Sequence, residues 1–302
     1  MVNIMSGPQK FRELLNDTSF LMVPGAFDCI SARLIEKARF PAVYLSGAGV
    51  ASSRLGKPDV GLTTMTEALD SARNVVNATN IPVICDVDTG FGNAVNVIRT
   101  TQMFEQAGVA AIQIEDQISP KKCGHTEHKL LIDKDEMVEK IRAFQYARRS
   151  PDFALIARTD AITVTGLENA IERAATYAAA GADIIFVESP RTVEEMKEIT
   201  KRLAGIPLLI NIVDGKGKTP VLPAKDLEVM GYKMAIYPGI PWMVAIKGIQ
   251  NVLKELKSKG TAIDCGDQMV TFKEIFELVD LEKYTALEKR FAVNKMKTDG
   301  KS

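Results

Sequence analysis

The chain has 302 residues, of which 46% are hydrophobic and 25% charged, as is usual for a globular protein with a sizeable core. Basic and acidic residues are equal at 38 each, so no net charge attracts the chain to nucleic acid or to a membrane surface. The four cysteines form no Cys-x-x-Cys pair, and no apolar run is long enough to span a membrane. These features predict a cytoplasmic protein that binds neither nucleic acid nor membrane.

Short apolar segments alternate with longer amphipathic ones along the chain, and this alternation predicts a parallel sheet covered by helices. The predicted strands are 20–27, 42–49, 81–90, 110–117, 153–161, 182–189, 207–213 and 233–238. Eight strands in one series favour a closed (β/α)8 barrel of the TIM type, with an open doubly wound sheet as the alternative. Two of the helical segments end in Gly108 and Gly181, which are well placed as helix C-caps.

The C-terminal region is longer than a minimal barrel requires. Helical patterns cover 241–260, 268–279 and 281–294, all beyond the eighth strand. No linker or repeat divides the chain, so we predict one barrel domain over 1–302, with 241–302 as a C-terminal helical extension. The extension either caps the barrel or packs on a neighbouring subunit.

Polar residues follow six consecutive predicted strands. They are Ser46 to Gly49, Asp86 and Asp88, Glu115 and Asp116, Arg158 and Asp160, Glu188, and Asn211. Any one of them alone is most simply a solvated loop residue. Because the carboxyl-terminal ends of barrel strands carry the active site, their recurrence predicts a polar site at that rim.

The two aspartates of the third strand predict a metal site. Asp86 and Asp88 are two residues apart, so an extended backbone directs both side chains to one face. With Glu115 from the next strand they make an oxygen-rich site that suits Mg²⁺, or Mn²⁺, better than zinc. The alternative is that the aspartates cap the following helix.

The loop after the fourth strand contains an unusual set of side chains. Cys123 follows two lysines and is close to His125, one of only two histidines in the chain. Positive neighbours lower the pKa of a thiol, which indicates an acid–base role for Cys123. The alternative is an inert cysteine in a solvated basic loop.

Six motifs in this order resemble the isocitrate lyase and phosphoenolpyruvate mutase superfamily. They are DVDTGFGN, IEDQ, KKCGH, ARTDA, VES and NIVDGKGKTP, and the resemblance runs from about Pro24 into the C-terminal helices. It implies a (β/α)8 barrel whose last helix is exchanged between subunits, in a homotetramer of paired dimers. DTGFG followed by KKCGH is a far more specific signal than any isolated glycine motif.

The resemblance also implies a ligand set. Mg²⁺ is expected to be held largely through water by Asp59, Asp86, Asp88 and Glu115. The carboxylate substrate is expected to contact Ser46, Gly47, Ala48, Gly124, Arg158, Asn211, Thr219 and Pro220.

Members of the superfamily that carry the KKCGH cysteine cleave carbon–carbon bonds, so Cys123 favours a lyase. Two activities fit: 2,3-dimethylmalate to pyruvate and propionate, or 2-methylisocitrate to pyruvate and succinate. Typical 2-methylisocitrate lyases have TEFG where this chain has Val213 to Lys216, and this difference favours 2,3-dimethylmalate. The alternatives are an oxaloacetate decarboxylase and an enzyme of the phosphoenolpyruvate mutase or phosphonopyruvate hydrolase type.

We hypothesise a retro-aldol cleavage of a magnesium-bound 2-hydroxy acid. Arg158, Asn211 and His125 hold the developing negative charge, and Cys123 protonates the carbanion. Glu188 orients Arg158 or His125, and Tyr44 is the candidate proton acceptor.

Overall fold

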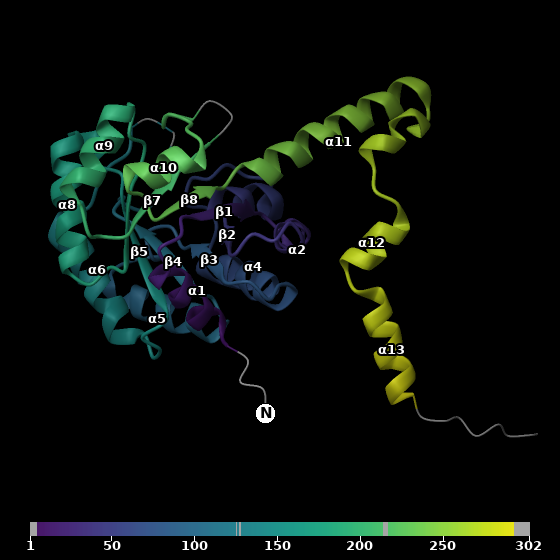
Figure 1. Cartoon of the computed structure of the whole chain (residues 1–302), viewed down its shortest axis with the longest axis horizontal. Helices are drawn as coiled ribbons and strands as arrows, with labels where there is room; N and C mark the ends of the chain where they lie inside the picture. The colour runs from purple at the N-terminus through teal and green to yellow at the C-terminus, as the bar shows by residue number, and fades with distance from the viewer. Residues whose placement is uncertain (1–4, 125, 127, 214–216, 293–302) are drawn as a thin grey trace, which may run out of the picture. The chain divides into compact units, whose positions relative to one another are not determined.

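The computed structural model describes residues 5–124, 126, 128–213 and 217–292. Its centre is a closed barrel of eight parallel strands in chain order, in which β1 pairs with β8 (Figure 1). The strands are β1 (Leu21–Ala26), β2 (Val43–Leu45), β3 (Val83–Asp86), β4 (Ala111–Glu115), β5 (Ala154–Thr159), β6 (Ile184–Val187), β7 (Leu208–Asn211) and β8 (Met234–Tyr237). Every strand lies within a predicted segment, which confirms the (β/α)8 barrel and excludes the open sheet.

The observed strands are shorter than the predicted segments because the residues after each strand form turns and short helices. After β2, Ser46 begins α3 (Gly47–Val50), and its hydroxyl accepts a hydrogen bond from the amide of Gly49. A single π-helical turn, η1 (Ala51–Leu55), continues this segment. Polar residues are thus turned toward the rim instead of continuing the sheet.

Helices cover the outside of the barrel. They are α1 (Gly7–Asn16), α2 (Cys29–Lys37), α4 (Met65–Ala78), α5 (Ala94–Gln106), α6 (Lys134–Ala147), α7 (Ile162–Thr165), α8 (Leu167–Ala179), α9 (Val193–Arg202) and α10 (Ala224–Met230). Shortly after α5 and α8, Gly108 and Gly181 adopt φ values of 84° and 109°. These left-handed conformations favour glycine and confirm the predicted C-caps.

Two apolar clusters hold the barrel together. One lies between strands and helices, and the other fills the barrel interior with inward-facing residues such as Ile84, Ile156, Phe186 and Leu209. Phe11 of α1 is fully buried in the interior cluster together with residues at the starts of strands. The packed interior leaves the carboxyl-terminal end of the barrel as the place for a site.

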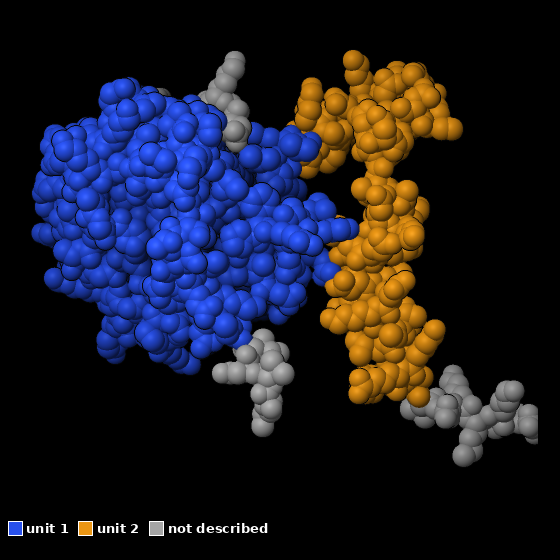
Figure 2. Space-filling model, viewed as in Figure 1, with its two compact units in different colours: residues 1–244 blue, residues 245–302 orange. Residues whose placement is uncertain are grey.

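The chain forms two compact units, residues 1–244 and 245–302 (Figure 2). Helix α11 (Ile240–Lys259) crosses the boundary, and η2 (Ile263–Gln268), α12 (Phe272–Leu278) and α13 (Leu281–Phe291) follow it. The second unit has large exposed apolar side chains, with Phe272 77% and Phe291 72% exposed. Among the described residues, no helix has both the length and the apolar character that a membrane span requires.

Candidate active site

A cavity of about 300 Å³ lies among the loops that follow the strands. Ten of the predicted site residues line it: Tyr44, Ser46, Ala48, Asp59, Asp86, Cys123, Gly124, Arg158, Glu188 and Asn211. Gly47, Asp88, Glu115, Thr219 and Pro220 do not line it, and His125 lies outside the described residues. The structure therefore brings most of the predicted residues together at one place.

Gly47 lies directly against this site although it does not line the cavity. A Cβ atom at residue 47 would be 2.7 Å from Oδ2 of Asp86. Because real Cβ atoms do not approach so closely, any side chain here displaces the Asp86 carboxylate. The segment after β2 thus fits closely over the carboxylate at the end of β3.

Arg158, the penultimate residue of β5, is at the centre of the polar contacts. Its Nε lies 2.9 Å from Oδ2 of Asp160, and its Nη2 donates to Oδ1 of the same carboxylate at 3.0 Å. Its Nη1 is 3.1 Å from Oε2 of Glu115, and its Nη2 is 3.6 Å from Oε2 of Glu188. Three buried carboxylates thus fix one guanidinium, a geometry that only the planar fork of arginine allows.

The carboxylates around Arg158 have opposite shifts in pKa. Burial raises the pKa of Glu115 well above its usual range, although Arg158 and Lys121 oppose the change. At Asp160 burial acts in the same direction, but the nearby Arg158 and Lys129 outweigh it and lower the pKa to about 2. Asp160 is therefore the permanent counter-charge of Arg158.

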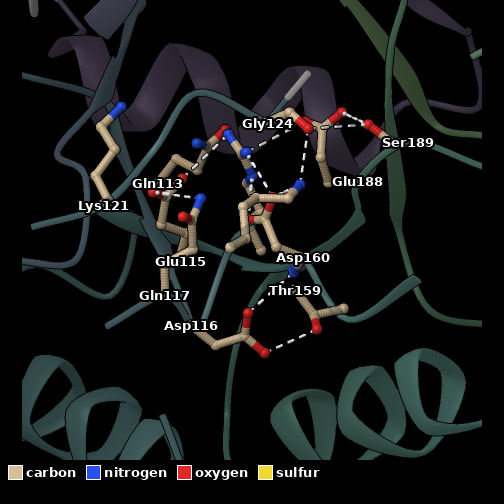
Figure 3. Close-up of polar contacts among 12 residues, drawn as sticks. Gln113, Glu115, Asp116, Gln117, Lys121, Gly124, Thr159, Asp160, Glu188 and Ser189 are labelled. Carbon is tan, nitrogen blue, oxygen red and sulfur yellow. Dashed lines mark hydrogen bonds and ion pairs between the residues drawn. The ribbon is translucent and has the colours of Figure 1, made fainter. Parts of the chain in front are cut away.

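Glu188 is positioned as predicted for a residue that orients Arg158. Besides the guanidinium, it accepts hydrogen bonds from the Ser189 hydroxyl at 2.8 Å and from the Asn211 amide at 3.4 Å. Figure 3 shows Glu188 and Ser189 on the same side of the group as Gly124. The Asn211 amide is thereby linked to Arg158 through one carboxylate.

Lys121 is the partner of two predicted metal ligands. Its Nζ lies 2.5 Å from Oδ1 of Asp59 and 2.8 Å from Oδ1 of Asp88, and its side chain is only 3% exposed. In Figure 3 the Lys121 side chain is directed away from Asp160 and Glu188. This contact was not predicted, because spacing alone does not indicate which way a loop lysine turns.

The predicted geometry of Asp86 and Asp88 is wrong in one respect. Asp86 is the last residue of β3, whereas Asp88 lies in the turn that follows, with a φ of 50° and its amide donating to Oδ1 of Asp86 at 3.1 Å. They are not alternate residues on one face of an extended segment. Burial, opposed by Lys121, raises the pKa of Asp88 to about 6.

The donor set fits a hard divalent cation. Asp59, Asp86, Asp88 and Glu115 offer only oxygen. Oε2 of Glu115 is buried and accepts no well-aligned hydrogen bond from a described residue, although it is paired with the Arg158 guanidinium at 3.1 Å. Within the described ranges, no three acidic, histidine or cysteine side chains converge closely enough to hold an ion directly. Mg²⁺ usually keeps several waters, so carboxylates that bind it through water need not converge.

Cys123 lines the cavity next to Gly124, and the two lysines before it have partners of their own. The Lys121 ammonium is bound by Asp59 and Asp88, and the Lys122 ammonium donates to the carbonyl oxygen of His128 at 2.9 Å. The acid–base role of Cys123 stays a prediction, which its position in the cavity supports.

Tyr44 was predicted as a proton acceptor, and its surroundings do not favour that role. Its hydroxyl lies 2.9 Å from Oε1 of Gln113, a buried residue that the sequence analysis did not select. Burial, with the charge of Asp86, raises the pKa of Tyr44 well above its ordinary value. The phenol therefore stays protonated, and its hydrogen is donated to Gln113.

Asp116 does not face the rim, because adjacent strand residues point to opposite sides. Its carboxylate accepts hydrogen bonds from the Thr159 hydroxyl at 2.7 Å, the Tyr177 hydroxyl at 2.8 Å and the Asp160 amide at 2.9 Å. Arg173 also donates to it at 3.2 Å. Figure 3 shows Asp116 and Thr159 below Asp160, so Asp116 supports the site from behind.

We expect Tyr177→Phe to lower the free energy of unfolding by about 2 kcal/mol, because it removes one hydrogen bond to a buried carboxylate. The substrate KM should stay unchanged, since three donors still hold Asp116. Urea unfolding and steady-state kinetics on the same preparation measure both quantities. A large rise in KM without a loss of stability contradicts the supporting role.

One wall of the cavity is apolar and was not predicted. It consists of Phe186, Val213, Ile236, Pro238, Trp242 and Met243. The predicted site residues were polar groups at strand ends, whereas Phe186 and Ile236 face the cavity from within strands. Period-two alternation along β6 and β8 is the signal that identifies such inward positions.

The fold and the site together define a (β/α)8 barrel with a buried arginine, a group of carboxylates and a cysteine at one rim. The model of the family described as phosphoenolpyruvate phosphomutase matches residues 11–257, and the chain belongs to this family.

The chain is 47% identical over 291 residues to the 2,3-dimethylmalate lyase of Eubacterium barkeri, covering 96% of this chain and 100% of that protein. It is 43% identical over 283 residues to the 2-methylisocitrate lyase of Halalkalibacterium halodurans, covering 94% and 93%. A solved structure of phosphonopyruvate hydrolase in complex with oxalate and Mg²⁺ has a TM-score of 0.86 and 30% identity, covering 95% of this chain and 99% of the other. The family thus includes a magnesium-bound enzyme with the same fold.

Proposed function

We propose that the protein is a carbon–carbon lyase that cleaves a small 2-hydroxy dicarboxylate to pyruvate and a second carboxylate. The observation that carries the proposal is that Cys123, Arg158 and Asn211 line one cavity with Asp59 and Asp86. A proton donor and an anion-binding group thus face the same small volume as carboxylates suited to a divalent cation. Two relatives that are named lyases, at 47% and 43% identity, support the class of reaction.

In the proposed reaction, the C2 hydroxyl loses its proton to water, and the bond between C2 and C3 breaks. C2 becomes the carbonyl carbon of pyruvate, and the electron pair of the broken bond stays on C3. Arg158, held rigidly by its three carboxylates, stabilises the carboxylate next to C3 as negative charge spreads onto it. Cys123 donates its proton to C3, which completes the second product. Water returns a proton to the Cys123 thiolate at the end of the cycle.

The carboxylates of Asp59, Asp86, Asp88 and Glu115 are the residues that would hold Mg²⁺, or Mn²⁺ in its place. When bound, the cation supplies positive charge that favours loss of the hydroxyl proton and orients the pyruvate half of the substrate. The surplus of negative charge supports this assignment. Five carboxylates at the rim, those of Asp59, Asp88, Glu115, Asp160 and Glu188, are paired with only three described cations, Lys121, Lys129 and Arg158, and Asp86 adds a sixth negative charge near Lys121.

The lining of the cavity favours a dicarboxylate with methyl groups. Arg158 is the sole cation among the described lining residues, and Phe186, Trp242 and Met243 add apolar surface to the same lining. A third carboxylate on this apolar surface would lose its hydration without gaining a partner, which costs several kcal/mol. 2,3-Dimethylmalate, which gives pyruvate and propionate, therefore fits better than 2-methylisocitrate.

2-Methylisocitrate, which gives pyruvate and succinate, is the second candidate because one close relative carries that name. Oxaloacetate decarboxylation and phosphoenolpyruvate mutase or phosphonopyruvate hydrolase chemistry need the same charge stabilisation but no cysteine proton donor. The presence of Cys123 in the cavity therefore speaks against them.

We further propose a homotetramer in which paired subunits exchange their C-terminal helices. The support is the large exposed apolar area of the second unit, including Phe272 and Phe291.

We also propose that the protein is located in the cytoplasm. The support is that its four cysteines are free thiols, which a reducing compartment maintains.

A substrate panel tests the proposed function. With Mg²⁺, we expect kcat/KM for pyruvate release to be at least about 100-fold higher for 2,3-dimethylmalate than for 2-methylisocitrate. The reason is that burying the third carboxylate of 2-methylisocitrate without a partner lowers kcat/KM by at least this factor. Oxaloacetate and phosphonopyruvate complete the panel. A preference for 2-methylisocitrate contradicts the assignment of 2,3-dimethylmalate as the substrate. Turnover of oxaloacetate alone contradicts the assignment of the protein as a carbon–carbon lyase.

A further inference from the structure

We propose that Lys129 is a positioning residue that holds the Cys123–Gly124 segment against Arg158. The inference rests on the proposed function, in which Cys123 is the proton donor. Lys129 follows Gly124 by five residues, and its side chain is only 1% exposed. Its Nζ donates to the carbonyl oxygen of Gly124 at 2.7 Å and to Oδ1 of Asp160 at 2.6 Å.

Burying an ammonium group is costly, since it loses several kcal/mol of hydration unless charges and hydrogen bonds replace the water. Asp160 provides the charge, but the same oxygen already accepts a hydrogen bond from Nη2 of Arg158. Arg158 and Lys129 thus share one carboxylate, which links the arginine to the loop. The Asp160 amide is fixed in turn by Asp116 at 2.9 Å.

Gly124 is pressed closely against the groups that Lys129 helps to hold. A Cβ atom at residue 124 would be 2.4 Å from Nη2 of Arg158 and 2.9 Å from Cδ of Glu188. The backbone of the loop therefore rests directly on the anion-binding group. Because Cys123 is the adjacent residue, the position of its thiol depends on where the Gly124 backbone is fixed.

The ends of the loop are tied separately. Gln117 and Leu131 form an isolated antiparallel bridge, and the amide of Ile118 donates to the carbonyl oxygen of Leu130 at 2.8 Å. The Gln117 side chain reaches further, since it donates to the Lys122 carbonyl oxygen at 2.8 Å and accepts from the Lys122 amide at 3.0 Å. Gln117 thus fixes the residue before Cys123, and Lys129 fixes the residue after it. The Ser189 hydroxyl is 3.5 Å from the Gly124 oxygen, a weak contact, so Lys129 provides the strong one.

The decisive test compares Lys129→Met with the wild-type enzyme. Methionine keeps most of the side-chain length but lacks the ammonium, and Asp160 retains Arg158 as its counter-charge, so the variant should fold. We expect kcat to fall about 10- to 100-fold, because the Cys123 thiol is then misplaced relative to the substrate. KM should change less than about threefold. Lys129→Arg, which keeps a buried cation and donor, should recover part of the rate.

A second readout needs no turnover. We expect iodoacetamide to alkylate Cys123 at least about tenfold faster in Lys129→Met than in the wild type, because the loop is released from Arg158. Mass spectrometry of the peptides gives the rate for Cys123, with Cys29 as internal reference. Lys233→Met is the matched control, since Lys233 also donates to loop carbonyls, at Ser19 and Asp17, but before β8 at the opposite end of the barrel.

The outcomes separate the inference from the proposed function. Faster alkylation in Lys129→Met alone supports the positioning role, even if no substrate of the panel is cleaved. If Lys129→Met has the same alkylation rate and the same kcat as the wild type, the positioning role is overturned. That result does not affect a lyase activity shown by the substrate panel. If the Cys123 alkylation rate and kcat change equally in Lys129→Met and Lys233→Met, Lys129 contributes only to general stability. That result also overturns the positioning role.

Discussion

Replacing Cys123 with serine is expected to lower kcat for pyruvate release by about 10²- to 10⁴-fold, the usual contribution of a positioned proton donor. A hydroxyl is a much weaker acid than a thiol, so the carbanion at C3 is no longer protonated efficiently. KM should change little, because Arg158 and Asn211, not Cys123, are proposed to bind the substrate carboxylate. Steady-state kinetics on 2,3-dimethylmalate measure both constants.

Cys29→Ser is the matched control for this experiment. Cys29 is also partly buried and outside disulfides, but it lies in the first turn of α2 and does not line the cavity. The control variant should keep the wild-type kcat. Full cleavage activity in Cys123→Ser would show that another group protonates the second product and would remove the main reason for assigning a lyase.

Arg158→Lys is expected to lower kcat/KM by about 100-fold or more. Lysine keeps the positive charge but cannot reproduce the bidentate pair with Asp160 together with the contacts to Glu115 and Glu188. Arg158→Met removes the charge and leaves three buried carboxylates without their shared partner. That variant should also lose about 3–5 kcal/mol of unfolding free energy.

Urea unfolding and kinetics together separate the two effects of Arg158. Arg148→Lys is the control, since Arg148 pairs with Asp183 at 3.3 Å, packs over the ring of Phe144 and does not line the cavity. It should lose some stability with kcat/KM unchanged. If Arg158→Lys is as active as the wild type, the guanidinium is a structural element and does not act on the substrate.

The barrel was predictable from the sequence because the eight strands have local signals, namely apolar runs between amphipathic segments. The rim residues were predictable for a related reason, since a polar residue at the end of a buried strand has few other places to lie. Arg158 and Asn211 lie at the ends of β5 and β7, Glu188 directly follows β6, and all three line the cavity. Cys123 was selected from its motif and lies there as well.

The rest of the site depends on side-chain directions that spacing does not determine. Asp88 was predicted to have an extended backbone, whereas the turn that follows β3 gives it a positive φ. The partners of Lys121 and Lys129 come from distant loops and strands, so nothing near them in the sequence indicates whether they are buried. The high pKa of Tyr44 follows from its burial, which exists only once the barrel closes.

The most direct test of the proposed lyase is the stoichiometry of products from 2,3-dimethylmalate in the presence of Mg²⁺, followed by proton NMR. The proposed reaction predicts pyruvate and propionate in equal amounts, and in D₂O one deuterium at C2 of propionate, delivered through the exchanged thiol of Cys123. The deuterated propionate should be lost in Cys123→Ser and kept in Cys29→Ser. Absence of both products, with turnover of oxaloacetate or phosphonopyruvate by the same preparation, would contradict the assignment of the protein as a carbon–carbon lyase.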